Sequence, residues 1–126
     1  MRTTSILGIA LFLSFSGMAA EQAAKVGGTF SSLEYHAESG DLNGWEVTLI
    51  PQADGSYFVL IQVAEGQAPE IFTGRAVANG SVFRITVAGK GPLAGTYMGS
   101  VTADELKLKT PVGNTERLKR KRSYWQ

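Results

Sequence analysis

The sequence predicts an all-β fold, an antiparallel meander of about eight short strands that closes into an up-and-down β-barrel. Short segments in which apolar and polar residues alternate recur along the chain, and clusters of Gly, Pro, Asn, Asp and Ser separate them. No segment of useful length after residue 20 has the period of a helix. A closed barrel is favoured because an open sheet of so many strands would leave two unpaired edges.

The first 20 residues are predicted to be a secretory signal peptide and are excluded from this fold. Arg2 gives a basic start, residues 6–15 are an apolar run too short to span a bilayer, and residues 17–20 are small. Cleavage after this stretch leaves residues 21–126 as a single barrel domain. The chain has no cysteine, so it has no disulfide and no site for an N-terminal lipid. We therefore expect a periplasmic or secreted bacterial protein.

Residues 45–64 are predicted to form a β-hairpin around which the other strands are arranged. Two strand-like runs flank a polar turn at residues 51–56, whose Asp54-Gly55 pair accepts the positive φ of a tight turn. In the first run one face carries Trp45, Val47 and Leu49. The second run is apolar on both faces and is expected to be central and covered on both sides: Tyr57, Val59, Ile61 and Val63 on one face, Phe58 and Leu60 on the other.

The remaining strands are expected on either side of this hairpin, at residues 28–37, 71–78, 82–88, 93–101, 105–109 and 115–122. Asn79-Gly80 is the strongest signal for a two-residue hairpin turn. In the first strand Leu33 and Tyr35 share a face that is expected to meet the core. Gly95 and Gly99 are expected to face the interior, which predicts tight curvature or a close approach of the backbone.

Charge is divided unevenly along the mature chain, which is neutral overall. Residues 21–70 hold eight acidic residues and one basic residue, whereas residues 71–126 hold ten basic and three acidic residues. Barrel closure pairs the acidic first strand with the basic last strand, so we expect the two halves to neutralise each other. The balanced total gives no reason to expect nucleic acid as a partner.

The two ends of the predicted barrel resemble the calycin group, which includes the lipocalins and the avidins. Gly28-Thr29-Phe30 heads the first strand and the last strand carries arginine, although Phe30 stands where the group usually has Trp. The resemblance implies a small barrel in which this aromatic residue packs near a basic side chain of the closing strand. Ser39-Gly40-Asp41, residues 62–66 and residues 123–126 loosely resemble small exported bacterial proteins without an assigned activity, which implies no function.

Two groups of residues, one aromatic and one that combines acids with a histidine, are candidate sites. Aromatic residues expected to point into the barrel either line an apolar ligand pocket or fill the interior: Trp45, Tyr57, Phe83 and Tyr97. Glu34, His36 and Glu38 alternate along one strand, with about 6.6 Å between successive Cα atoms. Such a set can hold a divalent metal, but without a second His or a Cys a solvated strand face is the stronger interpretation.

A third candidate site is the basic cluster near the end of the chain, which consists of Arg117, Lys119, Arg120, Lys121 and Arg122. Such a cluster suits an anionic lipid, lipopolysaccharide or an acidic protein. Neutralisation by the acidic half of the chain is the stronger interpretation.

The sequence contains no catalytic signature, so we expect neither an enzyme nor a cofactor. His36 is the single histidine, and no Gly-x-Ser-x-Gly motif is present. We expect an exported, non-catalytic binding module that uses the barrel interior or a loop-lined mouth to bind an unknown small molecule or envelope protein. The alternative is a protein–protein module, such as a lysozyme-inhibitor-like protein that acts on an envelope-degrading enzyme. A weaker alternative is a metal-dependent enzyme built on His36. A membrane-spanning barrel is excluded because Arg84, Lys107 and Lys109 are expected to point outward.

Overall fold

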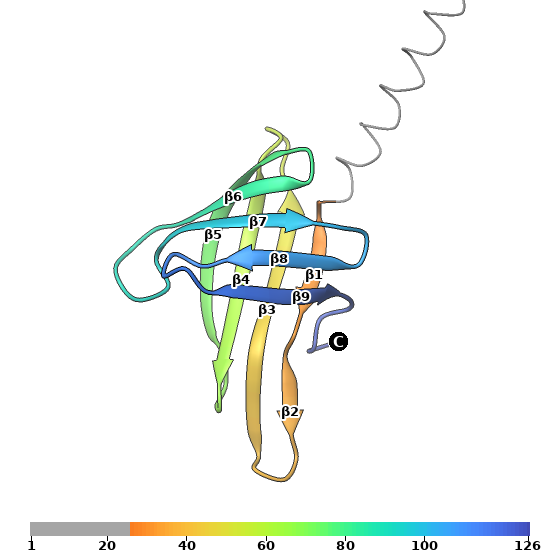
Figure 1. Cartoon of the computed structure of the whole chain (residues 1–126), viewed down its shortest axis with the longest axis vertical. Coiled ribbons are helices and arrows are strands. Elements are labelled where there is room, and N and C mark those ends of the chain that lie inside the picture. Colours follow the sequence, from red (N-terminus) through yellow and green to blue (C-terminus); the bar gives the residue numbers. More distant parts are fainter. Residues whose placement is uncertain (1–25) are drawn as a thin grey trace, which may run out of the picture.

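The computed structural model describes residues 26–126, and the predicted signal peptide lies outside them. The described residues form strands and no helix (Figure 1): β1 (Gly28–Ser31), β2 (Glu34–His36), β3 (Asp41–Pro51), β4 (Tyr57–Glu65), β5 (Glu70–Asn79), β6 (Val82–Val87), β7 (Gly95–Val101), β8 (Glu105–Lys109) and β9 (Thr115–Arg120). The prediction of an all-β fold is confirmed. No helix in this part of the chain has the length and apolar character to cross a membrane.

The strands form one antiparallel sheet that closes on itself. Each strand from β3 to β9 pairs with the next, β9 pairs with β1, and β1 pairs with β3. The barrel therefore has eight strands, β1 and β3–β9, and β2 is an additional segment that pairs with β3. The expected pairing of the first and last strands is confirmed, since Phe30 lies opposite Arg120 and Ser31 lies opposite Lys119.

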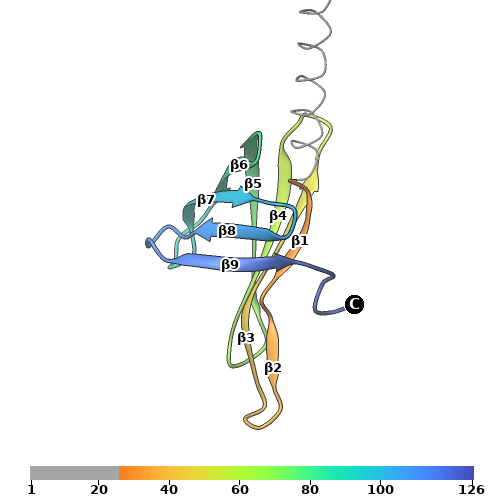
Figure 2. The same cartoon turned by 45° about the vertical axis from the view of Figure 1, so that its right-hand side comes forward.

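The predicted first strand is divided into β1 and β2 because the chain bends at residues 32–33. Both segments keep one register along β3. Gly44 of β3 lies at the bend with a φ of 119°, and a Cβ there would be 2.3 Å from the carbonyl oxygen of Ser32. Only glycine permits this close approach. As a result β3 begins at Asp41 instead of residue 45, and the β2–β3 hairpin projects beyond the barrel (Figures 1 and 2).

Aromatic and aliphatic side chains from all eight barrel strands fill the interior. The alternation predicted along β6 is confirmed: Phe83, Ile85 and Val87 are buried, whereas the residues between them are exposed. Gly99 of β7 faces inward beneath the Phe83 ring, and a Cβ at this position would lie 2.3 Å from the Cζ atom of that ring. The close approach predicted for Gly99 is therefore made by an aromatic side chain.

The expectation that β4 is covered on both sides is wrong for the first half of the strand and right for the second half, where Gln62 and Ala64 on the outward face are buried. Its inward residues are buried, but Phe58 on the outward face is 38% exposed and Leu60 is half-buried. The reason is barrel closure, because in a closed barrel only one face of each strand meets the core. Tyr35 is exposed as well, contrary to the prediction, because β2 lies beyond the barrel, whereas Leu33 is buried as predicted, in a small separate cluster with Leu42 and Ala64.

The outward surface of β3 and β4 is covered where the chain after β9 folds back over it. The buried carboxylate of Glu46 accepts hydrogen bonds from the Ser123 hydroxyl at 2.7 Å, the Tyr124 amide at 2.7 Å and the Gln62 side-chain amide at 3.1 Å. Gln62 in turn accepts a hydrogen bond from the Trp125 indole N–H at 2.8 Å. Because no buried side-chain polar atom among the described residues lacks a hydrogen-bond partner, this network is fully satisfied and holds the C-terminal segment on the barrel.

Candidate binding surfaces

The aromatic residues predicted to line a ligand pocket belong to the hydrophobic core. Phe83 and Tyr97 are 1% and 0% exposed, and Trp45 and Tyr57 are half-buried against the same core. The Trp45 and Tyr97 rings meet edge to face, with their centroids 6.5 Å apart. At these positions the barrel is filled by its own side chains.

A hollow of about 470 Å³ opens at one end of the barrel, between the β4–β5 and β6–β7 loops, and we call it the mouth hollow. Its lining residues are Val63, Glu65, Gln67, Ala68, Glu70, Pro92 and Leu93. The Tyr97 hydroxyl donates a hydrogen bond of 2.6 Å to the Leu93 carbonyl oxygen, which fixes the β6–β7 loop. Burial raises the pKa of Tyr97, so its phenol stays a neutral donor.

The four predicted aromatic residues do not form one site. Trp45 lies opposite Val63 and Tyr97 bonds to Leu93, so these two aromatic residues support the lining of the mouth hollow from behind. Phe83 packs against Gly99. No local pattern in the sequence indicates the lining itself, because the two loops that form it are distant along the chain and meet only when the barrel closes.

The β2–β3 hairpin and the β4–β5 loop lie at the same end of the molecule (Figures 1 and 2). The hairpin, the loop and the strand ends beside the loop carry five acidic residues: Glu34, Glu38, Asp41, Glu65 and Glu70. We call this group the acidic tip. The strand register brings its members together, because Asn43 of β3 lies opposite both Glu34 of β2 and Glu65 of β4. Between residues 26 and 126, none of the five forms an ion pair. The tip is therefore a projecting surface of uncompensated negative charge.

The predicted metal-ligand set lies on this tip. Glu34 and His36 are exposed on β2, and Glu38 is exposed in the following turn, where Gly40 N–H donates to the His36 carbonyl oxygen at 2.8 Å. A shallow hollow runs along residues 35–39. Within the described part of the chain, no three His, Cys, Asp or Glu side chains gather closely enough to hold a metal ion.

The residues of the predicted basic cluster have different roles. Arg120 closes the barrel: its guanidinium carbon lies 4.5 Å from the centroid of the Phe30 ring, and its nitrogens donate to the carbonyl oxygens of Gly27 at 2.8 Å and Ala103 at 3.0 Å. A Cβ at position 28 would lie 2.8 Å from Arg120 Nη1, so this approach requires Gly28. The calycin resemblance implied such a contact between the aromatic residue and the closing strand. The rest of the cluster is exposed: Arg117, Lys119, Lys121 and Arg122.

The expected neutralisation of the basic cluster by the acidic half of the chain is not made through ion pairs within residues 26–126, and Glu34 and Glu38 lie apart from the cluster. The ion pairs between described residues are Arg117 with Glu105, at 2.7 Å, and Arg75 with Asp54. Both join neighbouring parts of the barrel wall and neither reaches the acidic tip. Hydrogen bonds from Ser56, followed by the charge of Arg75, lower the pKa of the Asp54 carboxyl in the β3–β4 turn. The acidic residues project at one end instead because β2 leaves the barrel before it can face β9.

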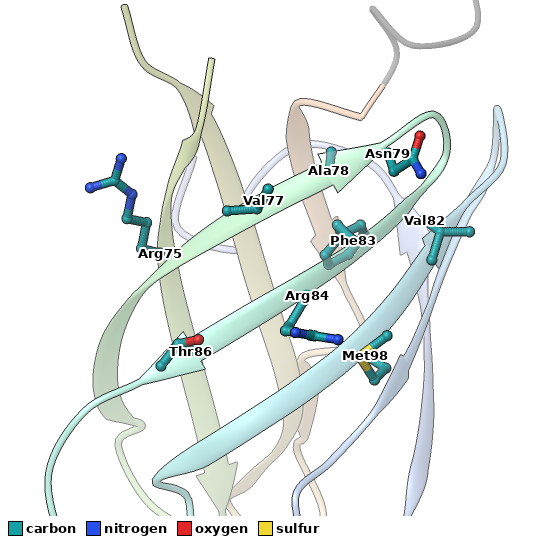
Figure 3. A pocket seen from close by; sticks show the side chains of 9 residues that line it. All are labelled: Arg75, Val77, Ala78, Asn79, Val82, Phe83, Arg84, Thr86 and Met98. Carbon is teal, nitrogen blue, oxygen red and sulfur yellow. The ribbon is translucent and has the colours of Figure 1, made fainter. Parts of the chain in front are cut away.

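The bases gather on the outward surface of β6–β9, which we call the basic face: Arg84, Lys107, Lys109, Arg117 and Lys119. A groove of about 620 Å³ lies beside it on β5–β7, and Figure 3 shows its lining residues: Arg75, Val77, Ala78, Asn79, Val82, Phe83, Arg84, Thr86 and Met98. A smaller hollow continues from Met98 to Lys107 and Lys109. Among the described residues, Arg117 is the one member of the basic face in an ion pair.

No known protein family, curated protein or solved structure matches this chain.

Proposed function

We propose that this chain is an exported, non-catalytic binding protein of calycin-like construction, and that it binds its ligand at the mouth hollow. The observation that carries the proposal is the filled interior, since Phe83 and Tyr97 pack as core residues while open space lies between two loops at the barrel end. Loops held on a rigid barrel are a common place for binding sites. The kinship with calycins rests on the contact of Arg120 with Phe30.

The chemistry of the hollow favours a ligand that combines an apolar part with a positive charge. Val63 and Leu93 provide an apolar floor, and Glu65 and Glu70 provide exposed carboxylates at the rim. A cation near two carboxylates is stabilised by electrostatic attraction, and an apolar group on the floor is stabilised because it is removed from water. The hydrogen bond from Tyr97 keeps the loop in place, so little ordering is needed on binding.

Native mass spectrometry of the protein purified from its own envelope tests this proposal. We expect a retained small molecule that disappears when Glu65 and Glu70 are both replaced by Gln. Replacing Glu34 and Glu38 by Gln removes the same charge outside the hollow and should leave the retained molecule in place. A protein that carries no bound species, or one whose ligand survives the first double replacement, would contradict binding at the mouth.

A second candidate function is an interaction with a basic protein of the envelope, such as an enzyme that degrades it. The projecting acidic tip favours this alternative, because its five carboxylates lie outside the hollow as well as at its rim. In the same experiment a protein partner would be retained instead of a small molecule. The replacement of Glu34 and Glu38 would then release it, which distinguishes the two candidates.

Export is part of the proposal and has its own test. The basic start, the apolar run at residues 6–15 and the small residues after it favour cleavage at residue 20 and a periplasmic or secreted protein. The intact mass of the mature protein should correspond to a chain that begins at Ala20 or Glu21. A mass that includes residues 6–15 would exclude cleavage at this site.

A further inference from the structure

Cationic and aliphatic side chains share the outward surface of the barrel wall. The strand register places one row across four strands, consisting of Val77, Arg84, Met98 and Lys109. The next row consists of Val82, Ser100, Lys107 and Arg117. Neighbouring strands are about 4.8 Å apart, so Arg84, Lys107 and Lys109 each lie beside a small or aliphatic side chain.

The aliphatic residues of this wall are open to solvent. Val77 is 66% exposed, Val82 is 49% exposed and Met98 is 41% exposed. Together they line the groove of about 620 Å³, in which Arg84 extends toward Met98 (Figure 3). The groove has no acidic lining residue. Within residues 26–126, Arg84, Lys107 and Lys109 form no ion pair, so their charges are available to an outside partner.

The construction of the wall decides which kind of partner fits. Every strand from β5 to β8 is hydrogen-bonded on both sides, so no free edge is present there to which an acidic peptide could add as a strand. A bilayer surface needs no edge. It requires several cations and a shallow set of apolar side chains at headgroup depth, and the long stems of Lys and Arg let their charges reach phosphates beside buried aliphatic groups.

We infer that the basic face and its groove dock on an anionic phospholipid bilayer. Val77, Val82 and Met98 enter the headgroup region, and Arg84, Lys107 and Lys109 contact lipid phosphates. The acidic tip lies on β2–β4 and at the start of β5, seven residues before Val77, and remains in water where the bilayer charge does not repel it. This inference does not depend on the proposed ligand site at the mouth.

Sedimentation with vesicles tests the charge requirement on the mature chain. We expect binding to vesicles of phosphatidylglycerol mixed with phosphatidylcholine, and little binding to phosphatidylcholine alone. Replacing Arg84, Lys107 and Lys109 by Gln should weaken binding roughly 100-fold, because each cation at an anionic surface contributes about fivefold. The matched control replaces Lys90, Lys121 and Arg122 by Gln, which removes the same charge outside the rows and should change binding far less.

A fluorescent probe tests the orientation. The chain has no cysteine, so the variants Met98→Cys and Glu65→Cys each accept one environment-sensitive label. On phosphatidylglycerol vesicles the emission of the label at position 98 should shift to the blue, while that at position 65 should not. Circular dichroism of each variant confirms that the fold is retained.

Three results would overturn the inference. The first is equal loss of vesicle binding in the two triple variants, which would mean that only net charge matters. The second is a blue shift at position 65 without one at position 98. The third is a dimer that forms through the basic face and disappears when Glu65 and Glu70 are replaced by Gln, which would assign the face to the acidic tip of a second copy.

Discussion

Arg120 is the residue on which barrel closure depends most directly. Its guanidinium lies over the Phe30 ring and donates to the carbonyl oxygens of Gly27 and Ala103, so one side chain joins β9 to the start of β1 and to the β7–β8 turn. The replacement Arg120→Lys keeps the charge but loses the planar stacking and the divergent N–H donors. We expect the free energy of unfolding to fall by about 1–3 kcal/mol, measured by urea denaturation.

Lys119→Gln is the matched control for this replacement. Lys119 is the exposed neighbour on the same strand, and in the described structure it has no ion pair. Its replacement should change stability by less than about 0.5 kcal/mol. Equal effects of the two replacements would mean that Arg120 acts only as one more positive charge.

Tyr97 gives the protein a dependence on alkaline pH. Burial raises the pKa of its phenol in the folded state, so the associated stability is present below the unfolded pKa of about 10 and is lost as the pH rises through the raised pKa. The variant Tyr97→Phe should lose about 0.5–1.5 kcal/mol at neutral pH, because the bond to Leu93 is gone. Above pH 10 its stability should fall less steeply than that of the unchanged protein. Tyr124→Phe, at an exposed tyrosine, is the control. If the stability of Tyr97→Phe and of the unchanged protein declined in parallel above pH 10, the assignment to Tyr97 would be contradicted.

At the scale of elements, the β6–β7 pair depends on a glycine that accommodates an aromatic ring. Gly99→Ala would place a methyl group 2.3 Å from the Phe83 ring, in a core without room to move it. We expect a loss of about 1–3 kcal/mol in the free energy of unfolding. In a double-mutant cycle, Phe83→Leu should recover part of this loss, since the shorter side chain leaves space for the methyl group. Additive effects would show that the ring is not the obstacle.

The C-terminal segment is the second element with a testable attachment. Glu46→Gln replaces one acceptor oxygen of the buried carboxylate by a donor that faces Tyr124 N–H or the Gln62 amide. An unsatisfied buried donor costs about 1–3 kcal/mol, so stability should fall by that amount. Release of the segment should also change the fluorescence of Trp125, which otherwise bonds to Gln62. Glu34→Gln, at an exposed acid, should change neither quantity.

The strands themselves were predictable because alternation along β6 to β8 is a local property of the sequence. The hairpin at residues 45–64 and the pairing of the first strand with the last followed from the same pattern. The bend at residues 32–33 was not predictable, because it depends on Gly44 meeting Ser32 across two strands. Likewise, nothing near Glu46 in the sequence indicates that residues about 77 positions later supply its hydrogen bonds.

The surfaces were harder to predict than the strands, for a related reason. The mouth hollow combines residues from two loops that are distant along the chain, and the basic face combines side chains from three strands, β6, β8 and β9. The basic cluster predicted near the end of the chain included Arg120. The guanidinium of this residue is engaged in barrel closure, so it does not belong to the basic face. The uneven distribution of charge also predicted that the acidic and basic halves of the chain neutralise each other. This neutralisation would require β2 to remain in the barrel, where its acidic residues could face β9.

The whole molecule is an electric dipole, with negative charge at the projecting tip and positive charge on the wall of β6–β9. Since the ion pairs between described residues are both exposed, each contributes little to stability and salt has little attraction to screen within the fold. We therefore expect the melting temperature to change little with ionic strength. A neutralised seam between two charged halves would instead lose stability steadily as salt is added.

The dipole should also be visible in chromatography at low ionic strength near neutral pH. Although residues 21–126 have no net charge, we expect a chain of these residues to bind both a cation exchanger and an anion exchanger, because each resin meets a different surface. Replacing Arg84, Lys107 and Lys109 by Gln should abolish retention on the cation exchanger alone, and replacing Glu38, Glu65 and Glu70 by Gln should abolish retention on the anion exchanger alone. If either triple replacement weakened retention on both resins, or if the unchanged protein bound to neither, the opposite charges would have to lie side by side.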